Sequence, residues 1–170
     1  MAVSLLFDKW DGIARSAELS ECGRYRWWLS RALPGDGQGV VCFVMLNPST
    51  ADGKLDDPTI RRCIGFARAW GFGRLSVRNL FALRATDPSE LATANDPTGG
   101  ERGDNELMAA RTADLVVCAW GAHRFARQRA IQAIGMWGKT PLSCLGTTKH
   151  GYPRHPLFVR ANKELEPYRP

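Results

Sequence analysis

The chain has 170 residues and a mass of 18.8 kDa; 44% of the residues are hydrophobic and 24% are charged. These values are typical of a folded domain and exclude a disordered chain, and no apolar run approaches the ~20 residues of a membrane span. The N-terminal residues 1–12 are too short, and lack the basic start, for a signal peptide. We therefore expect a single monomeric domain over residues 1–170 in the cytoplasm.

The sequence alternates between apolar runs and amphipathic segments. Residues 24–33 are expected to form an edge strand, and the continuously apolar run 40–46 a strand buried on both faces. In chain order, the remaining expected elements are a helix at 58–71, a strand at 75–83, a capped helix at 87–94, a helix at 104–113, a strand at 113–121, a helix at 122–138 and a strand at 141–146. This order predicts an α/β fold with three layers, α/β/α, in which a mainly parallel four-stranded sheet carries an additional N-terminal edge strand.

The charged residues are unevenly distributed around a net charge of +6. All charged residues between Asp57 and Asp87 are arginine, and those between Asp114 and Glu164 are all basic. A chain sorted in this way can present one basic face, as nucleic-acid-binding proteins do. Alternatively, folding mixes the segments and disperses the charge. The pattern favours nucleic acid, with DNA the first choice, or a nucleotide as the partner.

The cysteines indicate a reducing environment. There are five, an odd number, and none forms a C-x-x-C pair; Cys42, Cys118 and Cys144 lie inside apolar runs, where a small hydrophobic residue is expected. Zinc sites and iron–sulfur clusters need closely spaced thiolates. The sequence therefore predicts neither of these groups, and no cofactor.

Most of the unusual polar residues follow the four expected buried strands. In parallel sheets, ligands bind beyond the carboxyl ends of the strands, so these loops should meet at one rim. The first loop begins with Asn47, whose amide can position a water molecule without removing its proton. Its further polar and turn-forming residues are Pro48, Ser49, Thr50, Asp52, Asp56 and Asp57. The aspartates could hold a hard metal such as Mg²⁺, Asp57 is better explained as a helix cap, and an ordinary turn would have the same composition.

The loop after the last expected strand is rich in groups that bind anions. Its candidates are Lys149, His150, Tyr152, Arg154 and His155. Histidine exchanges a proton near neutral pH, and neighbouring cations favour an anionic ligand or a developing negative charge; the alternative is a solvated basic loop. His123, at a helix start, is interpreted as a surface residue. Asn79 ends the second expected buried strand, while Phe81 could stack on a flat ligand or belong to the core.

Four segments carry a resemblance to known families. VMLNPSTADGKLDDPTIRRCIGFARAWGFG, NLFALRATDP, LVVCAWGAH and LGTTKHGYPRHPL resemble a bacterial and phage family described only as a domain of unknown function, over about residues 22–160. More distantly, the same segments resemble the uracil-DNA glycosylase superfamily. Asn47-Pro48 is similar to the Asn-Pro motif of its thymine and mismatch-specific branch, and His155-Pro156 to its closing His-Pro motif. Met45 and Leu157 stand where that superfamily usually has Gly and Ser.

The distant resemblance implies hydrolysis of the N-glycosidic bond of a base in DNA or in a nucleotide, without a metal. It implies that Asn47 orients the attacking water and that His155 stabilises the departing base. Phe81 or Tyr152 would stack on the base, Leu157 or Tyr152 would fill the gap it leaves in DNA, and the phosphates would be held by Lys149, Arg154 and Arg84. Two alternatives remain open. One is a metal-dependent phosphoester hydrolase using Asp52, Asp56 and Asp57, and the other is a binding module without catalysis.

Overall fold

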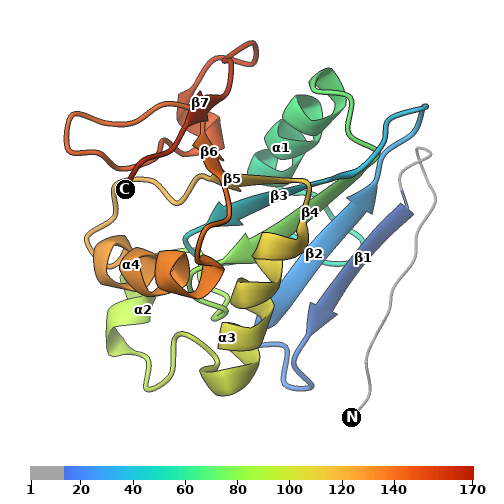
Figure 1. The fold of residues 1–170 in the computed structure, drawn as a ribbon. Coiled ribbons are helices and arrows are strands. Elements are labelled where there is room, and N and C mark those ends of the chain that lie inside the picture. The colour runs from blue at the N-terminus through green and yellow to red at the C-terminus, as the bar shows by residue number, and fades with distance from the viewer. Residues whose placement is uncertain (1–13) are drawn as a thin grey trace.

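The protein is built on a seven-stranded mixed sheet, seen in a computed structural model that describes residues 14–170 (Figure 1). The segment inspected for a signal peptide therefore lies outside the described residues. The strand order is β1-β2-β4-β3-β5-β6-β7. The strands are β1 (Ala14–Leu19), β2 (Arg26–Ala32), β3 (Val40–Met45), β4 (Arg74–Asn79), β5 (Leu115–Cys118), β6 (Leu142–Cys144) and β7 (Glu166–Pro167).

The expected α/β class is confirmed, but the sheet is larger and more mixed than expected. Strands β4, β3, β5 and β6 are parallel. Strands β1 and β2 pair antiparallel at one side, and β7 pairs antiparallel with β6 at the other. The prediction of a mainly parallel four-stranded sheet with one extra edge strand was wrong. The sequences of β1 and β7 have no strong strand pattern, and these segments are strands because β2 and β6 pair with them.

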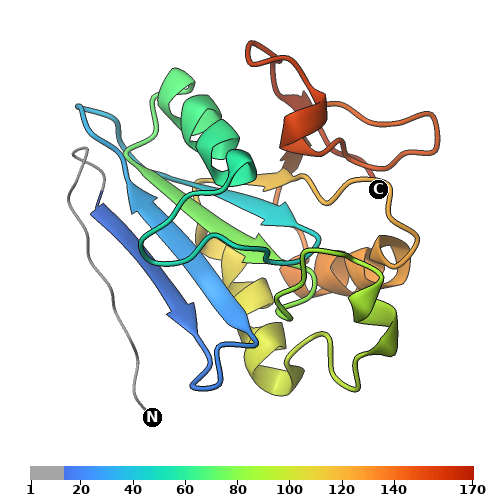
Figure 2. The ribbon, with the colours of Figure 1, turned by 180° about the vertical axis from the view of Figure 1, so that it is seen from behind.

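Helices lie on both faces of the sheet, as the two opposite views show (Figure 2). The helices are α1 (Pro58–Ala69), α2 (Glu90–Thr93), α3 (Gly100–Met108) and α4 (Ala126–Trp137), with 3₁₀ turns η1 (Ala109–Thr112) and η2 (Pro156–Phe158). Alternate residues of β3 point to opposite faces. Val41 and Phe43 pack in the core with α1, whereas Cys42 and Val44 pack in the core with α3 and α4. No helix within residues 14–170 is long and apolar enough to cross a membrane.

Several element ends differ from those expected. The strand expected at 75–83 stops at Asn79, and the helix expected at 87–94 forms only over Glu90–Thr93. The helix expected at 104–113 begins earlier, at Gly100, and continues as η1. α4 begins at Ala126, a turn later than the expected start at 122. These differences arise where turns connect the elements, because local propensity specifies element ends weakly.

A buried charge cluster anchors the loop between β3 and α1. The carboxylate of Asp56 accepts from Arg31 Nε at 2.7 Å and from Arg15 Nε at 3.2 Å, and the side chain of Arg31 is fully buried. Arg31 also donates to the carbonyl oxygens of Asp52 and Leu55. Two strands and the loop are thereby fixed to one another, so the loop that begins with Asn47 has a defined path.

Candidate functional site

A cavity of about 420 Å³ opens beyond the carboxyl ends of β3 and β5. Residues from six segments line it: Arg26 of β2; Met45, Leu46, Asn47 and Ser49; Asp57, Thr59 and Ile60; Ala85, Thr86 and Pro88; Trp120, Gly121, Ala122 and His123; and His155 and Phe158. The structure thus brings together Asn47, Ser49, Asp57 and His155 among the residues singled out in the sequence. Asn47 and His155 are far apart in the chain and share this cavity.

The amide of Asn47 has a fixed orientation. Its Nδ2 donates to the carbonyl oxygen of Pro48 at 3.0 Å and to that of Ala85 at 2.8 Å. Both amide protons are therefore engaged, and the side-chain oxygen has no hydrogen-bond partner among residues 14–170. Because an amide oxygen accepts hydrogen bonds, Asn47 offers the cavity a held acceptor for a water molecule or a ligand N–H.

The imidazole of His155 offers the cavity a hydrogen-bond donor, whereas Asn47 offers an acceptor. Its Nδ1 accepts a hydrogen bond from the backbone N–H of Leu157 at 3.3 Å, capping η2. In the neutral ring the proton must then be on Nε2, which is a donor. Burial lowers the pKa of His155 below its usual value of 6.5, while the charge of Asp57 opposes that shift. The ring is therefore neutral at pH 7 and presents an N–H donor.

Backbone hydrogen bonds hold the His155 loop against the end of β5. The N–H of Gly121 donates to the carbonyl oxygen of Pro153 at 3.0 Å, and the N–H of Arg154 donates to that of Gly146 at 2.9 Å. Gly121 has a φ of 76°, and a Cβ there would lie 3.7 Å from the Cβ of His155. Glycine at this position permits the turn, because its positive φ is unfavourable for other residues.

Arg26 is a site residue that sequence reasoning missed. It is only 2% exposed, yet no carboxylate within residues 14–170 forms an ion pair with it. Its Nη1 donates to the carbonyl oxygen of Ala51 at 2.7 Å, while its buried Nε has no hydrogen-bond partner in the described structure, residues 14–170. Burial lowers the pKa of Arg26 to about 10, against the opposing charge of Asp57. The cavity therefore contains a buried, charged guanidinium with unused donor capacity.

Asp57 and His123 complete the titratable groups of the cavity. As expected, Asp57 caps α1, accepting from the backbone N–H of Ile60 at 2.8 Å, and its second oxygen has no hydrogen-bond partner among the described residues. His123, interpreted as a surface residue, is half-buried in the cavity lining. Its place after the buried strand β5, in the sequence Trp120-Gly121-Ala122-His123, was the signal that should have identified it.

Other predicted binding residues lie elsewhere. His150 and Tyr152 line a separate cavity of about 600 Å³ beside α4. Arg154 donates through Nε to the carbonyl oxygen of Thr147, and Lys149 is exposed away from the Asn47 cavity. The loop folds back on itself through a bridge between Thr147 and Pro153, and this hairpin points His155 and His150 into different cavities.

The segment after β4 has mainly packing roles. Phe81 is 8% exposed and belongs to the core on the α3 and α4 face. Arg84 joins two loops by donating to the carbonyl oxygens of Ser49 and Gly23. Asn79, the last residue of β4, is buried, and no described residue forms a hydrogen bond with its amide nitrogen or oxygen. None of the three lines the Asn47 cavity.

The three aspartates after Asn47 point to different partners. Asp52 accepts from the backbone N–H groups of Lys54 and Leu55, Asp56 binds two arginines, and Asp57 caps α1. Pro48 is buried and Thr50 is exposed, and neither lines the cavity. No group of three His, Cys, Asp or Glu side chains within residues 14–170 could hold a metal ion. The expected Asp52, Asp56 and Asp57 ligand set is therefore not assembled.

The fold and this cavity define an α/β protein with a cleft at the carboxyl ends of its parallel strands, in which a few polar side chains lie among apolar ones. The chain belongs to the family described as "Protein of unknown function (DUF1643)", whose family model matches residues 26–157. That range includes every described strand except β1 and β7. No curated protein and no solved structure matches the chain closely enough to indicate a relationship.

Proposed function

We propose that the protein is a glycosylase-like hydrolase that cleaves the N-glycosidic bond of a base in DNA or in a nucleotide. The observation that carries this proposal is the pairing, in one cavity, of a fixed amide acceptor at Asn47 with a neutral N–H donor at His155. Hydrolysis of this bond needs a positioned water on the sugar side and a hydrogen-bond donor on the base side. The resemblance to the uracil-DNA glycosylase superfamily assigns these two roles to the same residues.

In the proposed reaction, the side-chain oxygen of Asn47 orients a water molecule towards the anomeric carbon. The water oxygen bonds to that carbon, the glycosidic electron pair leaves with the base, and one water proton ends on the released base. His155 donates from Nε2 to the base oxygen on which negative charge develops. Preorganised donors in a site that excludes water stabilise such charge strongly. Asp57, through its second oxygen, can accept the water proton in transit.

Arg26 supports the same reaction. A departing base is anionic, and the buried guanidinium supplies a fixed positive charge in the same cavity. Asp57 acts on this charge only from a distance and forms no ion pair with it, and a buried charge without such a pair is costly. The buried charge of Arg26 is explained when the departing base supplies the compensating negative charge in the transition state.

The decisive experiment is a base-release assay. Oligonucleotides that carry uracil and other modified bases, and the corresponding free nucleotides, are incubated with the wild type, and released base is measured by chromatography. Asn47→Ala and His155→Ala should each reduce the rate by about 10²–10³-fold, the usual effect of removing one such stabilising group. The matched controls are Asn105→Ala, an exposed amide on α3, and His150→Ala, which leaves the cavity unchanged.

Two results would refute the proposal. One is the absence of base release from every substrate, and the other is a rate that neither Asn47→Ala nor His155→Ala changes. Addition of a chelator gives a further check, because no step needs a metal. A base-release rate abolished by the chelator would contradict this metal-free mechanism.

A further inference from the structure

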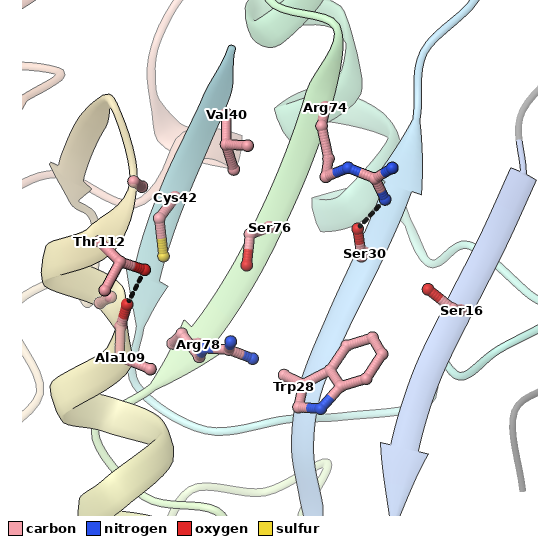
Figure 3. A pocket seen from close by; sticks show the side chains of 12 residues that line it. Ser16, Trp28, Ser30, Val40, Cys42, Arg74, Ser76, Arg78, Ala109 and Thr112 are labelled. Atoms are coloured by element: carbon pink, nitrogen blue, oxygen red, sulfur yellow. Dashed lines mark hydrogen bonds between the residues drawn. The ribbon is translucent and has the colours of Figure 1, made fainter.

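A second polar hollow lies on the sheet face that α3 flanks. Three serines and a cysteine from four neighbouring strands form a row across the sheet, because Ser16 pairs with Ser30, Ser30 with Ser76, and Ser76 with Cys42 (Figure 3). The hollow has a volume of about 290 Å³ and shares no residue with the Asn47 cavity. Small side chains therefore leave space where the rest of this face is covered.

Arginines stand at the two ends of this hollow. Arg74 and Arg78 lie on the same face of β4, four residues apart, so that their Cα atoms are separated by ~13 Å along the strand. The Nη1 of Arg74 donates to the hydroxyl of Ser30 at 3.2 Å. The residues that line the hollow include no aspartate or glutamate, so the hollow itself carries positive charge.

The guanidinium of Arg78 is incompletely satisfied. Its Nη1 lies 3.4 Å from a carboxylate oxygen of Glu106, but the buried Nε and Nη1 atoms have no hydrogen-bond partner within the described part of the chain. Buried donors without partners are rare and call for an explanation. The guanidinium also lies 5.8 Å from the ring centre of Trp28, whose indole N–H is fixed by Glu18 at 2.7 Å. This end of the hollow therefore combines the incompletely satisfied guanidinium of Arg78 with the ring of Trp28, whose orientation Glu18 fixes.

We propose that this hollow binds a nucleoside monophosphate. Arg74 and the serine hydroxyls are suited to the phosphate, since arginine donors fit phosphate oxygens and hydroxyls commonly contact them. The base lies against Trp28 at the other end, where aromatic side chains stack on bases of any sequence, and Arg78 donates to a base oxygen. The volume of about 290 Å³ is at the lower end of the ~300–1,000 Å³ of small-molecule sites.

Isothermal titration calorimetry with the wild-type chain tests this site. The ligands are the four common ribonucleoside monophosphates, the matching nucleosides and inorganic phosphate. At least one monophosphate should bind, and both its nucleoside and inorganic phosphate should bind about tenfold or more weakly, because each lacks one half of the contacts. Absence of binding by every monophosphate, or equal binding by inorganic phosphate, would overturn the proposal.

Substitutions of the lining residues test whether the monophosphate binds in this hollow. Arg74→Gln and Arg78→Gln should each weaken binding by about tenfold or more, and Ser76→Leu should abolish it by filling the hollow. The control Arg68→Gln removes an exposed arginine on α1. Asn47→Ala should leave it unchanged, which separates this site from the proposed hydrolase. If Arg78→Gln fails to fold, Arg74→Gln and Ser76→Leu still decide, and unchanged affinity in both would refute the assignment.

Discussion

Replacing Asp56 by Asn removes the charge from the buried cluster that fixes the loop after β3. Asp56 is the carboxylate partner of Arg31, whose side chain is fully buried, and it also binds Arg15. Breaking one partner of a buried ion pair costs about 3–5 kcal/mol, because the remaining charge is left without compensation. Arg31 keeps its bonds to the carbonyl oxygens of Ser16, Ser30 and Asp52. We therefore expect the lower end, about 3 kcal/mol.

Urea unfolding followed by circular dichroism measures this loss directly. For a chain of this length, about 3 kcal/mol corresponds to a fall in Tm of about 6–12 °C. The control is Asp36→Asn, because Asp36 is exposed and its carboxylate has no hydrogen-bond partner among the described residues. An Asp56→Asn variant whose free energy of unfolding stays within about 0.5 kcal/mol of wild type, the range of neutral surface changes, would show this reasoning to be wrong.

Two further predictions concern pH and backbone space. Because burial lowers the pKa of His155, the unfolded chain binds more protons than the folded chain below pH 6.5; stability from this group is full above that pH and declines as the pH falls. His155→Gln should lose this dependence in urea unfolding at pH 5–8, whereas exposed His150→Gln should keep it; identical profiles for wild type and His155→Gln would contradict the assignment. At Gly103 a Cβ would lie 1.8 Å from the carbonyl oxygen of Thr98, so Gly103→Ala should destabilise the protein by about 3 kcal/mol. Gly65, within α1, has open space around it, and Gly65→Ala should stabilise by about 0.5–1 kcal/mol; equal effects in thermal unfolding would refute the comparison.

The central strands could be predicted because their composition is dictated by burial on both faces. The run that forms β3 is apolar at every position, and β5 is similar. β1 has the sequence ARSAEL and β7 is the dipeptide Glu166–Pro167. Neither sequence favours a strand on its own terms. They become strands because a neighbouring strand supplies hydrogen-bond partners, and that information is tertiary.

In the candidate site, too, some residues could be predicted from the sequence and others could not. Asn47 and His155 could be placed at one rim because each follows a strand of the parallel set, and strand polarity requires those ends to meet. Arg26 could not be found because it lies in a strand between half-buried aromatic neighbours, with no alternation that marks it as buried. The register between β1 and β2 shifts after Glu18, which pairs with Trp28, so that Leu19 pairs with Arg26. This irregularity at Trp27 decides which way Arg26 faces, and no periodicity in the sequence marks it.

The short strand β7 affects how copies of the protein can meet. It covers one side of β6, and its Pro167, opposite Ser143, has no N–H to donate. A strand edge that is long and regular invites another chain to extend the sheet, which is a common route to aggregation. Here the edge strand β7 is only two residues long, and one of them is proline. Because proline has no backbone N–H to donate, another chain cannot easily extend the sheet past β7.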